Sequence, residues 1–202
     1  MNLFKPVKNY TKGRTQSIKG ICIHIAEGTA YQVYQTFNNE PKSAYYLILR
    51  NGDTWQFVLE QDTAWHAGYK DRPTAQIVLD NIELNPNNYL IGVEFEGYGN
   101  QDITEIQYVN GGKVIGEIAK RNGLGLNRNE ILRHNEIRKS KTCPGLVSVE
   151  KLIRYAQNPP QINQIDELKI KISLLQKLLE LLRLLMPYQK LGGEIEDERG
   201  DL

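Results

Sequence analysis

The chain contains 202 residues, of which 40% are hydrophobic, enough for one packed domain with an appendage or for two small domains. Its 25 basic and 24 acidic residues give a formal net charge of +1, so composition offers no electrostatic case for a nucleic-acid-binding protein. Two cysteines are too few for a disulfide-based fold.

The N-terminal residues Met1 to Pro6 lack the long apolar segment of a classical signal peptide. No uninterrupted apolar run elsewhere reaches the length needed to span a bilayer. We therefore expect a soluble protein that is synthesised in the cytoplasm.

The first expected element is a buried strand over residues 20–26, an apolar run of strand length that carries His24 near its end. Thr29 can cap a short helix that extends to about Asn38. A histidine in a buried strand is commonly a core residue, so His24 alone does not indicate a metal site.

Two β-prone runs follow, over residues 44–50 and 54–59. They are joined through Asn51-Gly52-Asp53, and because Asn-Gly accepts the positive φ of a tight turn, a β-hairpin is predicted. Residues 61–89 are polar and contain two prolines. They are predicted to form a long surface loop of the kind that often carries function.

A further strand is predicted over residues 90–96, with Glu94 and Glu96 on one face and Val93 and Phe95 on the other. An acidic face on an apolar strand is typical either of a functional site or of a sheet surface open to water. Periodicity does not choose between the two glutamates.

The remaining elements of this part of the chain are predicted to be a helix over 104–121, a strand over 131–133 and a helix over 148–156. Thr104 and Ser148 can cap the helices, Gly111-Gly112 weakens the first of them, and Asn122-Gly123 ends it. Strands and helices alternating in this order predict an α/β fold, with a mixed central sheet flanked by helices, over residues 1–158.

The loop after the last strand carries His134 and Cys143 nine positions apart, with Lys141 two residues before the cysteine. Zinc binds imidazole nitrogen and thiolate sulfur readily, and a catalytic zinc uses three protein ligands and leaves a fourth position for water. The third ligand must come from elsewhere, and His24 is a suitable candidate. His66, in Trp65-His66-Ala67-Gly68, is better placed to touch a substrate.

Each candidate also has an ordinary structural interpretation. A free cysteine is most often a small buried hydrophobe, and Lys141 could be an exposed surface lysine. The basic residues around it, Arg133, Arg138 and Lys139, are better explained as a loop serving a site than as a surface for a polyanion.

From about Gly20 to Ala156 the chain resembles the type-2 N-acetylmuramoyl-L-alanine amidases, a zinc amidase superfamily that includes phage lysozyme-type amidases and the peptidoglycan recognition proteins. The matching motifs, in the family's order, are Ile23-His24, Ser43 to Ile48 with Arg50-Asn51-Gly52, Asp62 to Gly68, Ile91 to Gly97, and His134 with Lys141 to Gly145. The resemblance implies the amidase type-2 fold, one Zn²⁺ per chain, and hydrolysis of the amide between N-acetylmuramic acid and L-alanine in peptidoglycan.

The resemblance also implies roles for individual residues. His24, His134 and Cys143 are the implied zinc ligands. Glu94 is the implied catalytic base that takes a proton from the attacking water and passes it to the leaving amine. Lys141 is implied to stabilise the oxyanion of the tetrahedral intermediate.

Substrate contacts are expected from Trp65 and His66, which would line the groove for the sugar-peptide substrate. The chain departs from the common family pattern at Tyr45, where many relatives have histidine in the Ser-Ala-His-Tyr stretch. Other relatives use a tyrosine in this strand as a catalytic partner, so Tyr45 or Tyr46 could contribute. We expect Tyr46 to contact the substrate.

A change in composition at Asn158-Pro159-Pro160 predicts a boundary, after which residues 159–202 form a linker, a helix over about 162–186 and a solvated acidic tail. The helix has a heptad pattern typical of a coiled coil. One core position is occupied by Ile165, Ile172, Leu179 and Met186, and the other by Leu168, Leu175 and Leu182.

Further leucines widen the apolar face of this helix beyond what a two-stranded coil would cover: Leu174, Leu178, Leu181, Leu184 and Leu185. A bundle of more than two helices, docking on the catalytic domain, or a membrane surface could cover them. We favour a homo-oligomer through residues 162–186 over membrane contact, and charged residues such as Lys169 and Arg183 argue against a spanning helix.

The function predicted from these features is that of a phage-type cell-wall lytic enzyme, an endolysin, reaching the wall after holin-type release. A cytoplasmic amidase that recycles muropeptides and a non-catalytic module that binds peptidoglycan are the alternatives. Members of the superfamily that only bind peptidoglycan have typically lost a zinc ligand, whereas this chain keeps all three.

Overall fold

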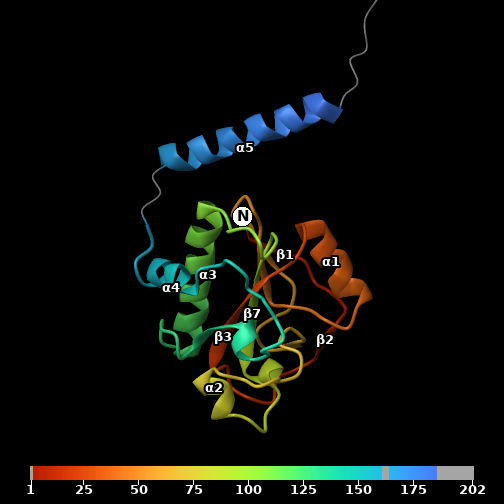
Figure 1. Cartoon of the computed structure of the whole chain (residues 1–202), viewed down its shortest axis with the longest axis vertical. Helices are drawn as coiled ribbons and strands as arrows, with labels where there is room; N and C mark the ends of the chain where they lie inside the picture. The colour runs from red at the N-terminus through yellow and green to blue at the C-terminus, as the bar shows by residue number, and fades with distance from the viewer. Residues whose placement is uncertain (1, 161–163, 186–202) are drawn as a thin grey trace, which may run out of the picture. The chain divides into compact units, whose positions relative to one another are not determined.

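The computed structural model describes residues 2–160 and 164–185 (Figure 1). The chain divides into two compact units, residues 1–161 and residues 162–202. The predicted core residue Met186 and the acidic tail lie outside the described residues.

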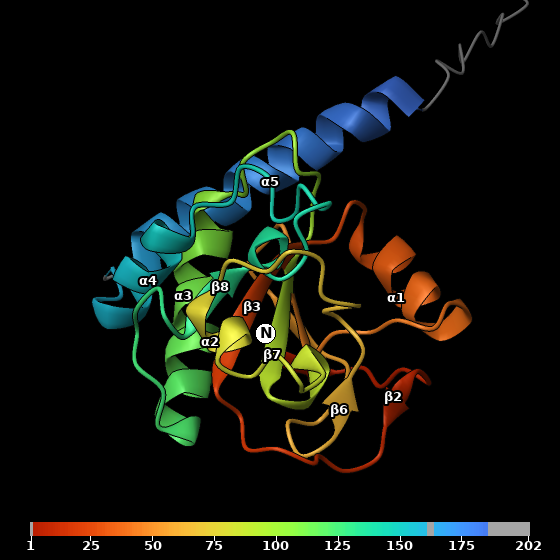
Figure 2. The same ribbon diagram turned by 60° about the horizontal axis from the view of Figure 1, so that its bottom comes forward.

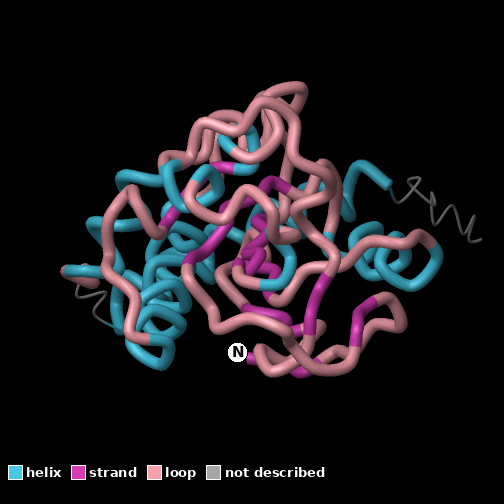
Figure 3. Tube along the Cα trace, turned by 90° about the horizontal axis from the view of Figure 1, so that it is seen from below, coloured by secondary structure: helices cyan, strands magenta, loops and turns pink. Residues whose placement is uncertain are grey.

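A six-stranded mixed sheet forms the centre of the first unit, and helices and loops lie around its central strands (Figure 3). Its strands, in spatial order, are β1 (Asn2–Phe4), β5 (Thr54–Gln56), β4 (Tyr46–Ile48), β7 (Leu90–Phe95), β3 (Gly20–Ile25) and β8 (Ile131–Arg133). β4, β7, β3 and β8 run parallel, and β5 pairs antiparallel with β4. The predicted strands and the hairpin are therefore confirmed. The short strands β1, β2 (Tyr10–Thr11) and β6 (Thr63–Ala64) were not predicted.

Three helices flank the sheet: α1 (Ala30–Asn39), α3 (Glu105–Asn122) and α4 (Val149–Gln157). α3 and α4 lie on one side of the sheet and α1 on the other (Figures 1 and 2). Thr29 and Thr104 form capping boxes at the starts of α1 and α3, and Gly123 ends α3 in the left-handed conformation. These bounds match the predicted helices because each cap supplies a hydrogen bond that the helix end lacks.

The glycine pair in α3 serves close packing. α3 is continuous through Gly111 and Gly112, although the sequence predicted a weak point there. A Cβ atom at Gly111 would lie 2.6 Å from the Phe95 ring, and one at Gly112 would lie 2.8 Å from the Cβ of Tyr155. The glycines therefore let α3 approach both the sheet and α4.

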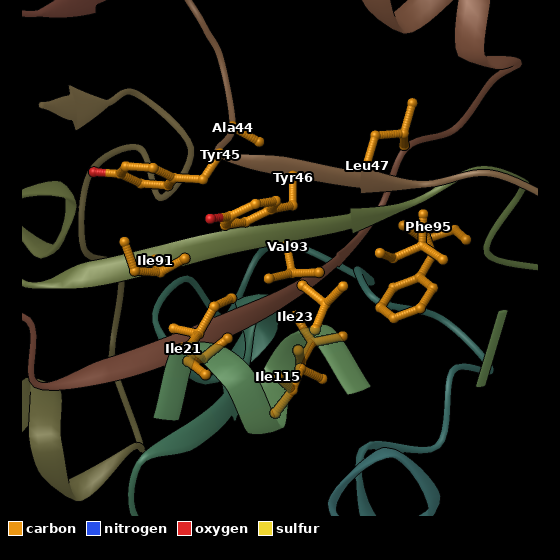
Figure 4. Close-up of a cluster of buried hydrophobic side chains, with 14 of the residues drawn as sticks. Ile21, Ile23, Ala44, Tyr45, Tyr46, Leu47, Ile91, Val93, Phe95 and Ile115 are labelled. Carbon is orange, nitrogen blue, oxygen red and sulfur yellow. The ribbon is translucent and has the colours of Figure 1, made fainter. Parts of the chain in front are cut away.

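Alternate residues of the central strands point to opposite faces of the sheet. Ile21 and Ile23 of β3 and Val93 of β7 lie close to Ile115 of α3 in the main hydrophobic core (Figure 4). His24 of β3 pairs in register with Glu94 of β7, so their side chains share the opposite face. The two parallel strands thus place an imidazole beside a carboxyl group.

The prediction that residues 61–89 form a surface loop was wrong in part. The segment contains β6, a one-turn helix α2 (Gln76–Leu79) and a 3-10 turn, η1 (Pro86–Asn88). Asn87 is buried, and its side-chain oxygen accepts hydrogen bonds from the backbone N–H groups of His66 and Ala67. A polar sequence can therefore be buried where its side chains satisfy the backbone.

The second unit contains one described helix, α5 (Gln164–Leu185), in agreement with the predicted helix. The side chains of residues 171–182 are exposed, including Leu175 and Leu179 of the heptad positions. The coiled-coil pairing stays a prediction. Among the described helices, none has the length and hydropathy that would be needed to cross a bilayer.

Candidate metal and substrate site

The candidate site lies at the C-terminal ends of three neighbouring parallel strands. His24 is the penultimate residue of β3, Glu94 is its neighbour in β7, and His134 follows β8 directly as the first residue of the turn η2 (His134–Glu136). Cys143 returns to the same point from the loop that follows. Carboxyl ends of parallel strands are common positions for ligand sites because the loops that follow them gather at one edge.

The structure brings the three predicted zinc ligands together. One donor atom each from His24, His134 and Cys143 lies within 4.8 Å of the others, and the His24 Nδ1 to Cys143 Sγ distance is 3.7 Å. Zinc binds nitrogen and sulfur at roughly 2.0 to 2.3 Å, so one ion could join these atoms after small side-chain adjustments. The donor set, two imidazoles and one thiol, is one that zinc accepts.

A series of hydrogen bonds determines which ring nitrogen of His24 is available to bind a metal ion. The carbonyl oxygen of Leu90 only accepts, so Nε2 of His66 donates to it at 3.2 Å. Nδ1 of His66 then accepts from Nε2 of His24 at 3.1 Å. The lone pair of His24 is left on Nδ1, the atom that faces Cys143.

His134 is oriented in the same way. Its Nε2 lies 3.1 Å from the carbonyl oxygen of Ala67 and donates to it, which leaves Nδ1 unprotonated. Burial lowers the pKa of His134 to about 4 and that of His66 to about 3, and it also lowers the pKa of His24. All three imidazoles are therefore neutral near pH 7, as metal ligation requires.

Burial raises the pKa of the Cys143 thiol. A buried thiol with a raised pKa stays protonated unless a cation stabilises the thiolate, and a coordinated divalent cation does so. This residue therefore fits a metal ligand better than a free nucleophile.

A second group of potential donors, Cys22, His24 and His66, also lies within 4.8 Å. Cys22 is fully buried, and the facing nitrogens of the two histidines already bond to each other. Cys22 also packs in a buried hydrophobic cluster, so we assign it to the core.

Glu94 and Glu96 have clearly different surroundings. Glu96 accepts hydrogen bonds from the backbone N–H groups of Ala30 and Arg50, both at 2.8 Å, and so ties α1 to the β4–β5 turn. Glu94 lies 4.0 Å from His24 Nδ1, and its Oε2 is buried without a hydrogen-bond partner in the described part of the chain. Burial raises the pKa of Glu94 to about 8, which suits a group that exchanges protons near neutral pH.

A cavity of about 700 Å³ opens onto these residues. We call it the metal pocket; it is bounded by the candidate ligands, Glu94, α1 and the loop that carries Cys143. Lys141 lines it, is exposed, and contributes to lowering the pKa values of His24 and His134 through its charge. Glu27 and Lys42 also line the pocket and were not singled out from the sequence, whereas Arg138, which lines it too, was predicted only as part of a basic loop serving a site.

The predicted substrate residues fall in three different places. Trp65 lines the metal pocket, with its backbone N–H bonded to Ser43 Oγ at 2.9 Å. His66 lines the pocket, but it is buried and bonded to the His24 ring, so it orients a candidate ligand. A Cβ atom on Gly92 would collide with the His66 ring, which explains the glycine before Val93.

Tyr46, which was predicted to contact the substrate, lies outside the metal pocket, and that contact stays a prediction. Its hydroxyl donates to Glu60 Oε1 at 2.8 Å in a different cavity, because neighbouring residues of a strand point to opposite faces. Tyr45 faces the other way, and its hydroxyl donates to the Asp62 carbonyl oxygen at 2.9 Å. Its ring centroid lies 6.0 Å from that of His66, so it packs behind the site.

Comparisons with known proteins agree with this geometry. A family model described as N-acetylmuramoyl-L-alanine amidase (Amidase_2) matches residues 14–146, more than half of the chain. The 1,6-anhydro-N-acetylmuramyl-L-alanine amidase AmpD of Haemophilus influenzae is 38% identical over 68 residues, which cover 33% of this chain and 32% of that protein. The chain thus spans about a third of the length of this relative.

Solved structures show the same fold at low sequence identity. An AmpD selenomethionine derivative has a TM-score of 0.60 and 21% identity, and the alignment covers 76% of this chain and 92% of that one. The Escherichia coli amidase AmiD in complex with a substrate has a TM-score of 0.56 and 23% identity, with 70% and 59% covered. A mutant endolysin from Bacillus subtilis has a TM-score of 0.51 and 15% identity, with 78% and 94% covered. With this fold and the match over residues 14–146, the chain belongs to the type-2 N-acetylmuramoyl-L-alanine amidase family.

Proposed function

We propose that the protein is a zinc-dependent amidase that cleaves the bond between N-acetylmuramic acid and L-alanine in peptidoglycan. The observation that carries this proposal is the convergence of two imidazoles, one thiol and a carboxyl group with a raised pKa on one cavity. In this proposal His24, His134 and Cys143 hold the ion. When bound, zinc supplies Lewis acidity that activates water and polarises the scissile carbonyl group.

Glu94 is the proton carrier in this proposal. Its buried, unpaired Oε2 can accept a proton from the attacking water and return it to the nitrogen of the leaving amine. The partner-free environment keeps both protonation states accessible near pH 7, since no hydrogen bond within the described residues holds the ionised form.

Lys141 is the proposed electrostatic partner of the carbonyl oxygen. It lines the metal pocket two residues before Cys143, and the described residues provide no ion pair for its ammonium group. An unpaired ammonium beside the scissile bond can stabilise the negative charge that develops on oxygen in the tetrahedral intermediate.

The biological role that we propose is wall lysis of the endolysin type, with the enzyme reaching the wall after holin-type release. The second unit supports this role: α5 exposes a wide apolar face, and we propose that copies of the chain assemble through it. Several catalytic units on one assembly would bind a polymeric wall with avidity. The sequence match to AmpD favours the second candidate, recycling of soluble wall fragments.

Digestion of intact sacculi and of soluble anhydromuropeptides, with products identified by mass, tests both roles. Release of stem peptides from both materials, with sacculi degraded efficiently, supports the lytic enzyme. Cleavage confined to soluble fragments supports recycling, and cleavage of neither while the protein still binds sacculi supports the non-catalytic module.

The assembly is tested separately by the molar mass in solution of the full chain and of a variant ending at Pro159. We expect an oligomer and a monomer respectively. Two monomers would contradict assembly through α5.

A further inference from the structure

Arg138 is a cationic residue of the metal pocket that the proposed reaction does not use. It follows η2 and lines the pocket near Gly68, whose added Cβ would lie 3.4 Å from Arg138 Nη1. Its guanidinium carbon lies 3.7 Å from the centroid of the Tyr69 ring. The cation therefore lies against an aromatic face, a contact that favours one position of the guanidinium.

The backbone around Arg138 is fixed as well. Its N–H donates to the His134 carbonyl oxygen at 3.0 Å, and the next residue, Lys139, donates to the Asp71 carbonyl oxygen at 2.8 Å. The segments carrying Arg138 and Tyr69 are thus joined through Asp71, so the backbone that carries the cation is held in place beside the Tyr69 ring.

The guanidinium has no anionic partner among the described residues. Its Nε is buried without a hydrogen-bond acceptor. The nearby Asp71 carboxylate is already occupied, by Arg72 Nε at 3.2 Å and by the Ser140 N–H at 3.2 Å. A partly buried, unsatisfied arginine is costly, so a ligand that supplies acceptors would be bound favourably.

The chemistry of the group identifies the ligand class. A planar guanidinium with donors in a fork matches a carboxylate in bidentate geometry. The substrate in the AmiD complex is anhydro-N-acetylmuramic acid-L-Ala-D-gamma-Glu-L-Lys. In such a molecule, the γ linkage leaves the glutamate α-carboxylate free, and the lysine carries a second carboxylate. Both lie on the peptide side of the scissile amide.

We infer that Arg138, held against Tyr69, is a specificity-determining residue that binds a carboxylate of the substrate's peptide arm. The inference rests on the proposed function, because the ligand is a muropeptide. It assigns the Gly68 and Arg138 side of the metal pocket to the peptide and leaves the remainder of the pocket for the sugar.

Binding to the zinc-loaded Glu94→Gln protein by calorimetry isolates recognition from turnover. The probes are N-acetylmuramoyl-L-Ala-D-γ-Glu-L-Lys, its glutamate α-carboxamide and its lysine carboxamide. Arg138→Gln should weaken binding of the first probe by roughly 10- to 100-fold. The carboxamide that lacks the recognised carboxylate should bind the Glu94→Gln protein weakly. Adding Arg138→Gln should cause no further loss of affinity for that probe.

Matched variants separate recognition from folding. Lys139→Gln removes the same charge one position away, at an exposed side chain, and should bind all probes as the parent does. Arg138→Lys keeps the charge without the fork and should lie between the parent and Arg138→Gln. Thermal midpoint and zinc content confirm that each variant is folded and loaded.

Two outcomes would overturn the inference. If Arg138→Gln weakens the binding of all three probes equally, or of none, carboxylate recognition by Arg138 is wrong. Cleavage of the first probe by the wild-type enzyme would then show that the proposed function still holds. If the wild-type protein neither binds nor cleaves any probe, the proposed function fails together with this inference.

Discussion

Two cavities of similar size on the first unit differ in what their polar groups do. The metal pocket has a volume of about 700 Å³, and a second cavity, which we call the Tyr46 pocket, has about 610 Å³. In the Tyr46 pocket, Glu60 accepts from Tyr46 at 2.8 Å and from Arg121 at 2.6 Å. In the metal pocket, Glu94 has a free oxygen and Arg138 a free nitrogen among the described residues.

Buried polar groups without partners, rather than cavity size, distinguish the metal pocket from the Tyr46 pocket. Polar groups that already bond to one another gain little from binding a ligand. Buried groups without partners are stabilised when a ligand supplies the missing hydrogen bonds.

Removing a candidate metal ligand should have the largest effect. We expect His134→Ala to lose both bound zinc and detectable amidase activity, because the two remaining donors cannot hold the ion in a catalytic geometry. Elemental analysis alongside an assay of peptide release measures both quantities. A full complement of zinc in His134→Ala would exclude this residue as a ligand.

Replacing the proton carrier should leave the metal in place. Glu94→Gln should retain zinc and lose roughly 100- to 10,000-fold in kcat, since a carboxamide cannot exchange the proton. The matched control is Glu96→Gln, which changes the carboxyl group that follows the end of β7 and that bonds only to backbone N–H groups. If Glu96→Gln proves to be the inactive variant, the assignment of the base is reversed.

Removing the residue behind His24 should reduce metal affinity. His66→Ala leaves His24 Nε2 without its acceptor, and we expect roughly 10- to 100-fold weaker zinc binding in a chelator competition. His66→Gln can still accept from His24 and should recover part of the loss. Unchanged affinity in both variants would show that the hydrogen-bond chain does not orient the ligand.

The stability of the metal-free protein should depend on pH through the same buried groups. His66 and His134 have folded-state pKa values of about 3 and about 4, against 6.5 in the unfolded chain. The unfolded chain therefore binds more protons below pH 6.5. Each histidine should lower the free energy of unfolding by roughly 1.4 kcal/mol per pH unit from there down to its folded-state pKa.

Glu94 acts in the opposite sense. Its folded-state pKa of about 8 exceeds the ordinary value of 4.5, so between these values the folded protein holds a proton that the unfolded chain has lost. Its contribution to stability is lost as pH rises from 4.5 through 8. In Glu94→Gln only the histidine effect remains. Urea unfolding should therefore show a larger decrease in the free energy of unfolding from about pH 7.5 to about pH 5.5 than in the wild-type protein. Equal losses would contradict the raised pKa of Glu94.

The Tyr46 pocket should give the smallest effect on function. Tyr46→Phe removes one satisfied hydrogen bond and should cost about 1 kcal/mol of stability with kcat and KM unchanged. A raised KM in this variant would restore the sequence-based prediction that Tyr46 contacts the substrate.

Local patterns predicted most of the fold. The caps at Thr29, Thr104 and Ser148 set helix starts that the structure reproduces, because capping depends on residues within one turn. β2 and β6 were missed because each has only two residues, too few for periodicity to register. β1 was missed because its partner β5 lies about fifty positions away in the chain. The burial of Asn87 was missed because its partners, the N–H groups of His66 and Ala67, lie about twenty positions away.

The sequence by itself determined the candidate ligands, through residue type and the family resemblance, and the positions along the chain of the strands that carry two of them, since strand patterns are local. Only the tertiary structure showed that Glu94 and Glu96 have different surroundings and that His66 bonds to His24. It also showed that Tyr46 lies in a different cavity and that Arg138 lies against Tyr69. These four outcomes depend on contacts between segments far apart in the chain, where the sheet register and the packing of loops against its edge decide which neighbours each side chain meets.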